Sequence, residues 1–259
     1  MNNTFTFTRF ALLFKKQFVE HLSTYLMSAA VLLGILAVML GFSAYADDGN
    51  ISIKTQFMFF MTTLMFSSVI FTSTVFSDLG DKRKAIPVLT LPVSHLEKYL
   101  VAWLYSFVVF FIVFLGCFYF VDILVIWICN ATSITKSTVL TLTNQELKPY
   151  RILPAFAILH ALAFCGAIFF EKLHLIKTAF TTLLFILAIV LLNQPLVKMI
   201  FGREVRNTVP FEHVGVIEGD TVWYVLSNDD SRHIVGVLVV ILVLILWTST
   251  YFKLKEKEV

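Results

Sequence analysis

The feature that most constrains this chain is a series of long apolar segments separated by short charged stretches. Six of them approach or exceed the length of about 20 residues with which an α-helix crosses a bilayer. They are Tyr25–Ala46, Phe57–Phe76, Tyr99–Cys129, Ile152–Phe170, Thr178–Leu192 and Ile234–Phe252. Of the 259 residues, 58% are hydrophobic and only 14% are charged, which is more apolar surface than a soluble domain can bury. The sequence therefore predicts an all-α polytopic membrane protein with six transmembrane helices.

The distribution of Lys and Arg predicts how these spans are oriented. Six spans place both chain ends on one side of the membrane, and that side carries twelve Lys and Arg residues against eight on the other. An excess of positive charge marks the cytoplasmic loops. We therefore expect both termini in the cytoplasm and the chain in the cytoplasmic (inner) membrane.

Two stretches outside the spans have patterns of their own. Four phenylalanines lie on one helical face of residues 5–21: Phe7, Phe10, Phe14 and Phe18. This spacing predicts an amphipathic helix in the cytoplasmic interface, and a cytosolic extension of the first span is the alternative. Residues 194–233 form the sizeable outer loop, with β-like pieces such as "TVWYVLS". The fifth span is expected to end before this loop at Pro195, because proline breaks or kinks a helix.

Most enzyme classes lack their signature in this chain. None of the ten glycines is followed by lysine, so the P-loop that holds ATP phosphates is missing, as are the zinc-protease and serine-hydrolase motifs. Three cysteines in or beside apolar runs indicate buried apolar residues rather than a disulfide framework. A net charge of +3 is too small to indicate nucleic-acid binding. We expect no catalytic residue, metal site or cofactor in this chain.

Polar residues inside the spans are candidates for function. Asp122 is placed near the outer end of the third span, where we expect an interfacial carboxylate that reaches water. His160 lies near the middle of the fourth span and either bonds to a Ser or Thr of a neighbouring helix or lines a substrate path. The second span is rich in small hydroxyl residues, which either permit close helix packing or line such a path. The candidate path residues are Thr62, Ser67, Thr72 and His160.

Residues 77–98, between the second and third spans, combine charge with a sharply defined helix start. The charged residues are Asp78, Asp81, Lys82, Arg83 and Lys84. Ser94 and Glu97 have the spacing of a capping box, and Pro92 prevents the helix from continuing upstream. A rigid, charged segment at the membrane surface suits docking to a cytosolic protein. The alternative is a solvated loop whose charges only set the topology.

These features resemble the permease subunits of type-2 ABC transporters. The resemblance rests on the charged cluster and the following "LTLPVSHLEK" at 89–98, with the amphipathic N-terminus, the six spans and the larger outer loop. In that family the cytosolic segment between spans two and three is a coupling helix that inserts into a separate ATPase. The resemblance thus implies that Asp78–Glu97 contacts an ABC-type ATPase, although Ala85 stands where the family usually has glycine.

The resemblance also implies a function for residues 1–259 as a single permease domain. Two permease copies, in a homodimer or heterodimer, would work with two ATPases that bind ATP and Mg²⁺ and would export a hydrophobic or amphipathic substrate. The path would lie between the permeases, lined by spans 1, 2 and 5. The alternative is a non-transporting membrane sensor or scaffold that uses the outer loop 194–233. An intramembrane enzyme is disfavoured by the missing motifs.

Overall fold

A computed structural model of the chain describes residues 5–76, 93–132, 136–144, 147–170, 173–202, 204–209, 213–218, 221–226 and 229–257. Within these ranges, six helices are long and apolar enough to cross a membrane, and there is little sheet. The helices are α1 (Phe7–Ala46), α2 (Ile53–Thr74), the continuous α4–η2–α5 (His95–Trp103, Leu104–Val109, Phe110–Thr132), α6 (Leu153–Phe169), α7 (His174–Phe201) and α8 (Asp229–Lys257). The predicted fold class, an all-α polytopic membrane protein, is confirmed.

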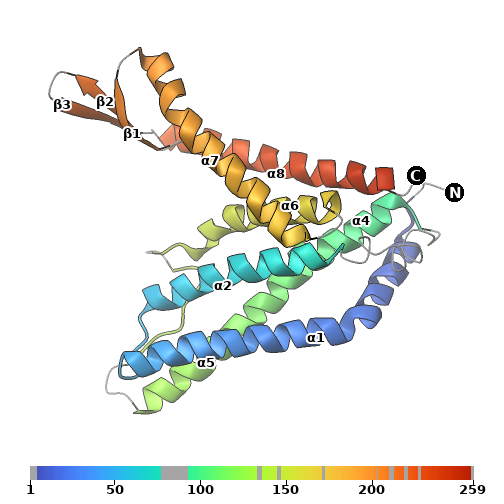
Figure 1. The fold of residues 1–259 in the computed structure, drawn as a ribbon. Helices are drawn as coiled ribbons and strands as arrows, with labels where there is room; N and C mark the ends of the chain where they lie inside the picture. Colours follow the sequence, from blue (N-terminus) through green and yellow to red (C-terminus); the bar gives the residue numbers. More distant parts are fainter. Residues whose placement is uncertain are drawn as a thin grey trace.

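The spans alternate in direction along the bundle. Figure 1 shows both chain termini at one end, which we call the terminal end, and the small sheet at the other, which we call the sheet end. If the positive charges orient the chain as predicted, the terminal end faces the cytoplasm. Helix α2 finishes and α4 begins at this end.

Two clusters of buried apolar side chains hold the bundle together. The larger joins α1, α2 and α5, where the ring of Phe60 meets Phe114 and Phe118 edge-on with centroids 5.5 and 5.0 Å apart. The smaller joins α6 to α4 and α8, with Phe164 at its centre. Helix α6 is the most enclosed span, whereas none of the residues of α7, all of which are described, is buried.

Of the predicted helix at residues 5–21, residues 7–21 are helical, but they are continuous with the first span. The two form α1, a single helix of 40 residues. At 1.5 Å per residue, α1 is about twice as long as a bilayer crossing needs. Figure 1 shows it bending, so that its N-terminal part turns toward the start of α4. From the sequence, an extension of the first span was the alternative to a separate interfacial helix. The continuous helix α1 matches that alternative in its connectivity.

The fifth span does not end at Pro195, so the predicted break was wrong. Helix α7 continues to Phe201 and ends at Gly202, whose φ of +60° lies in the left-handed region that favours glycine. Pro195 removes one backbone donor from the helix. Transmembrane helices tolerate such gaps where neighbouring groups or local adjustment satisfy the freed carbonyl. Gly202, rather than Pro195, terminates this helix.

The outer region predicted as a loop contains a three-stranded antiparallel sheet. Its strands β1 (Val205–Val209), β2 (His213–Glu218) and β3 (Thr221–Leu226) pair in chain order. Within the central strand β2, Val216 pairs with Val205 on β1 and with Trp223 on β3. The β-like interpretation of "TVWYVLS" is confirmed as β3. The element between α7 and α8 is thus a small sheet that begins beyond the end of α7.

Candidate functional site

The start of α4 has the predicted capping box. Ser94 is the N-cap, with an extended backbone, and its Oγ accepts a hydrogen bond from the Glu97 N–H at 3.3 Å. Glu97 Oε2 accepts one in return from the Ser94 N–H at 2.8 Å. Each side chain satisfies a backbone donor that a helix start leaves unpaired. The sharply specified helix start inferred from the sequence is confirmed.

The same carboxylate holds the start of α1. Glu97 Oε1 accepts hydrogen bonds from the Thr6 N–H at 2.7 Å and from Arg9 Nη2 at 3.2 Å. Thr6 is the N-cap of α1, and its own side chain makes no cap bond, so Glu97 supplies an acceptor at that helix end. Glu97 is fully buried, and Arg9 is 31% exposed. One side chain therefore joins the first turns of two helices that lie far apart in sequence; we call this arrangement the Glu97 junction.

A second contact joins α1 to the third span, eight residues further along each helix than Thr6 and Glu97. Tyr105 Oη donates a hydrogen bond to the carbonyl of Phe14 at 2.9 Å. Its ring stacks on Phe14 and Tyr25, with centroids 4.5 and 5.6 Å away. Phe14 belongs to the face of phenylalanines found in the sequence, and this part of that face packs against protein. The N-terminal part of α1 and the start of the third span are thus tied at two points.

The charged residues predicted to contact an ATPase, Asp78, Asp81, Lys82, Arg83 and Lys84, lie outside the described residues. Ser94 and Glu97, the remaining members of that set, are described. They stand directly where the chain returns from residues 77–92. Of the predicted partner-binding residues, the structure thus describes Ser94 and Glu97, both of which belong to the Glu97 junction.

His160 is buried in a polar network that joins three spans. Its Nε2 lies 2.9 Å from Ser106 Oγ, and its Nδ1 accepts a hydrogen bond from Trp247 Nε1–H at 3.3 Å. Ser106 Oγ lies 2.9 Å from the Ala102 carbonyl, which it can reach as a donor. The expectation that His160 bonds to a Ser or Thr of a neighbouring helix is confirmed.

The donor capacity of these groups fixes the direction of the network. An indole N–H can only donate, so His160 Nδ1 accepts from Trp247 and carries no proton. The remaining ring nitrogen, Nε2, then carries the hydrogen and donates it to Ser106. The hydroxyl of Ser106 donates onward to the carbonyl of Ala102. Every member of the chain from Trp247 to Ala102 has a partner, so the network fixes how α8, α6 and the third span pack together.

Ser106 lies in a short π-helical stretch, η2 (Leu104–Val109), inside the third span. Such a stretch inserts extra backbone into an α-helix and is frequent at functional sites. Here it separates the α4 part of the span, which carries Glu97, from the α5 part. No pattern in the sequence indicates this irregularity.

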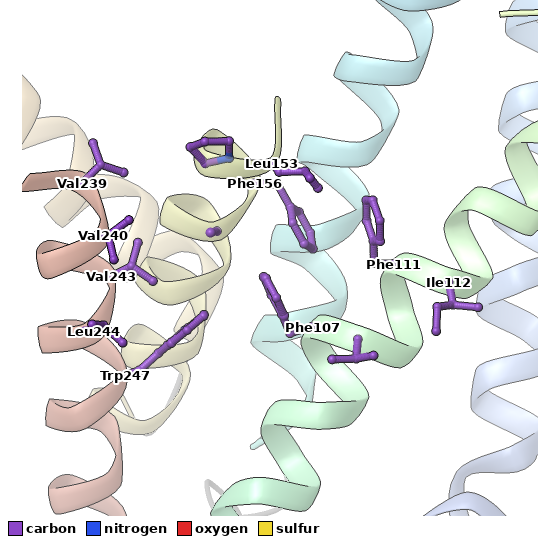
Figure 2. A pocket seen from close by; sticks show the side chains of 13 residues that line it. Phe107, Phe111, Ile112, Leu153, Phe156, Val239, Val240, Val243, Leu244 and Trp247 are labelled. Atoms are coloured by element: carbon purple, nitrogen blue, oxygen red, sulfur yellow. The ribbon is translucent and has the colours of Figure 1, made fainter. Parts of the chain in front are cut away.

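An apolar cavity of about 510 Å³ opens between the third, fourth and sixth spans. Figure 2 shows Phe107, Phe111 and Phe156 close together on one side of it, with Val243 and Trp247 on the α8 side. The cavity shares Trp247 with the His160 network and Phe107 with η2. Spans 1, 2 and 5 were expected to line a path between two permease copies, whereas this cavity lies within one copy.

The predicted path residues are not brought together at this cavity. None of Thr62, Ser67, Thr72 and His160 is among the described residues that line it. Thr62 bonds back to the Met58 carbonyl of its own helix at 2.8 Å, and Ser67 likewise bonds to α2 carbonyls. Thr72 is buried, and its Oγ1 has no hydrogen-bond partner within the described part of the chain. Thr62 and Ser67 thus satisfy their hydroxyl groups within α2 itself.

Asp122 is fully buried, so the expectation that it reaches water was wrong. Its neighbours Val121 and Val125 pack in the same cluster as Leu140. Residues 136–144 therefore cover this turn of α5, a fold-back that the apolar pattern of the span did not reveal.

Within the described ranges no group of three or more His, Cys, Asp or Glu side chains is placed to hold a metal ion.

Two contributors to the site were missed from the sequence: Arg9, as the partner of Glu97, and Trp247, as the partner of His160. A tryptophan inside an apolar span is a donor that needs an acceptor. That rule could have singled out Trp247, but nothing in the sequence could have identified its partner.

Searches with protein-family models, among curated proteins and among solved structures find no match to this chain.

Proposed function

We propose that this chain is the membrane-spanning subunit of an ATP-driven exporter and couples a separate ABC-type ATPase to the movement of a hydrophobic or amphipathic substrate. The observation that carries the proposal is the Glu97 junction. A buried carboxylate binds the starts of α1 and α4 together where the chain returns from the charged segment 77–92. A loop that only sets topology would not need such a junction.

In the proposed mechanism, the Glu97 junction transmits movement of residues 77–92 to the membrane spans. ATP and Mg²⁺ would be bound by the ATPase, whose closure would displace residues 77–92. Because Glu97 holds both Ser94 and Thr6, the displacement would reach the first and third spans together. The π-helical stretch η2 gives the third span a place to adjust, since such stretches interrupt the regular hydrogen-bond ladder. A second permease copy, homologous or identical, would complete the path in the cytoplasmic membrane.

Co-purification tests this proposal. The tagged chain is extracted from its native membrane in mild detergent, and bound proteins are tested for a P-loop sequence and for ATP hydrolysis. We expect an ATP-hydrolysing subunit that is lost when Asp81, Lys82 and Arg83 are replaced by alanine. The control is the double variant K253A/E256A, which removes an exposed ion pair near the C-terminus. Equal recovery of the ATPase with both variants, or no ATPase with the unaltered chain, contradicts the proposal.

The sheet favours a second candidate, a membrane sensor or scaffold that binds a partner outside. Trp223 and Tyr224 on β3 are 63% and 54% exposed, and exposed aromatic side chains are common in binding surfaces. Replacing residues 205–226 by a short Gly-Ser linker separates the two functions. An exporter would retain coupling to its ATPase, whereas a sensor would lose its outer partner and have no ATPase to retain.

A further inference from the structure

The cavity between the third, fourth and sixth spans has a composition that restricts its ligand. Apolar side chains make up its walls, apart from the indole N–H of Trp247. That N–H is already donated to His160. A sugar, an ion or a polar drug would therefore find no hydrogen-bond partner here and would lose its hydration on entering. The ligand that suits this lining is a hydrocarbon chain.

The exposure of the lining residues shows the direction of entry. Phe156 and Val243, on the inner side, are 1% and 5% exposed. Ile112 and Val240, at the rim, are 62% and 57% exposed and belong to helices that are apolar enough to span the membrane. The cavity is thus closed toward the bundle and open along the apolar outer surface of these helices. Its volume of about 510 Å³ lies within the range of ordinary ligand pockets, about 300–1,000 Å³.

An unfilled cavity of this size would be unfavourable. Aromatic rings that face a void lose the dispersion contacts that close packing provides. Phe107, Phe156 and Trp247 each present a ring to this space. The rings of Phe107 and Phe156 stack at 5.0 Å, and Trp247 meets Phe107 edge-on at 5.4 Å, so this wall is held in place by its own contacts. A flexible chain can fill the space without disturbing them.

We propose that this cavity binds one acyl chain of a membrane phospholipid, which enters from the bilayer between α5 and α8 and packs on the Trp247 ring. The headgroup would stay outside the cavity, at the membrane surface. The bound chain would then form part of the wall that keeps the Trp247 N–H on His160. This inference concerns a lipid site within one copy of the chain and does not depend on the exporter assignment.

Fluorescence quenching by brominated acyl chains tests the proposal, because bromine quenches indole emission at contact. The full-length chain, with the exposed Trp127 and Trp223 replaced by phenylalanine, retains Trp103 and Trp247, whose rings lie 5.2 Å apart. It is reconstituted into phosphatidylcholine vesicles with either brominated or ordinary acyl chains. We expect strong quenching, reduced at least twofold by Ala157→Phe, which fills the cavity from α6.

The matched control is Ala155→Phe, which adds the same side chain to an exposed position on α6 outside the cavity lining. We expect it to leave the quenching unchanged. If Ala157→Phe disrupts folding, as judged by helix content and gel filtration, Val240→Phe at the exposed rim replaces it. Equal quenching in the filling and control variants would show that these tryptophans meet lipid only at the bundle surface. Absence of quenching would show that something other than lipid covers the cavity. Either result overturns the proposal.

Discussion

Glu97 and Thr6, which lie 91 positions apart in the sequence, are joined by a hydrogen bond of 2.7 Å from the Thr6 N–H to the Glu97 carboxylate. The bond places the first turn of the first span on the first turn of the third. Its acceptor is also the partner of Arg9 and part of the Ser94 capping box. The proposed mechanism, in which displacement of residues 77–92 moves the first and third spans together, depends on this shared carboxylate.

Replacing Glu97 by alanine should destabilise the protein substantially. The N–H groups of Thr6 and Ser94 would lose their acceptor, and each buried donor left unsatisfied costs about 1–3 kcal/mol. We therefore expect the thermal unfolding midpoint in detergent to fall clearly, with a smaller fall for Glu97→Gln, which keeps one acceptor oxygen. Glu256→Ala serves as the control, since its exposed pair with Lys253 contributes at most about 1 kcal/mol. Equal midpoints for E97A and E256A would show that the junction contributes no stability.

The interaction between Ser106 and His160 should appear as a measurable coupling. A double-mutant cycle with Ser106→Ala and His160→Phe isolates it, because the two residues are in direct contact. We expect a coupling of about 0.5–1.5 kcal/mol in the free energy of unfolding, the usual net contribution of a hydrogen bond. Additive effects of the two substitutions would mean that the network seen in the structure does not form.

A side chain at position 166 should not be tolerated where α6 crosses α7. A Cβ built on Gly166 would collide with the Oγ1, Cγ2 and Cβ atoms of Thr178. Overpacking of this kind costs about 1–3 kcal/mol, and small residues are what allow membrane helices to approach closely. We expect Gly166→Ala to lower the unfolding midpoint and a second substitution, Thr178→Ala, to recover part of the loss. Gly116→Ala, which meets no atom within 4 Å, should be neutral or stabilising. Similar midpoints for the two alanine variants would contradict the tight crossing.

Gln56 should anchor the segment that folds back over the sheet end of the bundle. Its Oε1 accepts from the Leu140 N–H at 2.8 Å, and its Nε2 donates to the Thr138 carbonyl at 2.9 Å. Gln56→Leu removes both bonds in a fully buried position. We expect faster protease cleavage within residues 136–144, by roughly tenfold if about 1.4 kcal/mol of local stability is lost. A rate unchanged from that of the unaltered chain would show that Gln56 does not hold the segment.

The sequence predicted those features that depend on local pattern. The six spans follow from apolar length, the start of α4 from the Ser94–Glu97 spacing, and β3 from the β-like composition of "TVWYVLS". His160 was correctly expected to bond to a hydroxyl group, because a polar side chain inside a span needs a partner. These predictions succeeded because each depends either on residues close together in the sequence or on the apolar surroundings of a membrane span.

The features that were missed depend on tertiary context. Pro195 lies inside α7, and Asp122 is buried because residues 136–144, which follow α5, fold back over it. The hydrogen bonds of Glu97 to Thr6 and Arg9 could not be predicted, because the capping box already explains why a glutamate stands at this position. The cavity beside Trp247 arises from the spacing of three helices that are far apart along the chain.

Site-specific photo-crosslinking tests the central claim most directly. A photoreactive amino acid is placed at Lys82, inside the proposed coupling segment, or at Lys255, an exposed position near the C-terminus on the same expected side of the membrane. After irradiation of intact cells, the crosslinked products are purified and sequenced. We predict an adduct between position 82 and a protein that contains a P-loop, with little or none from position 255. If position 82 yields no such adduct, or if both positions yield it equally, residues 77–98 are not the contact with an ATPase.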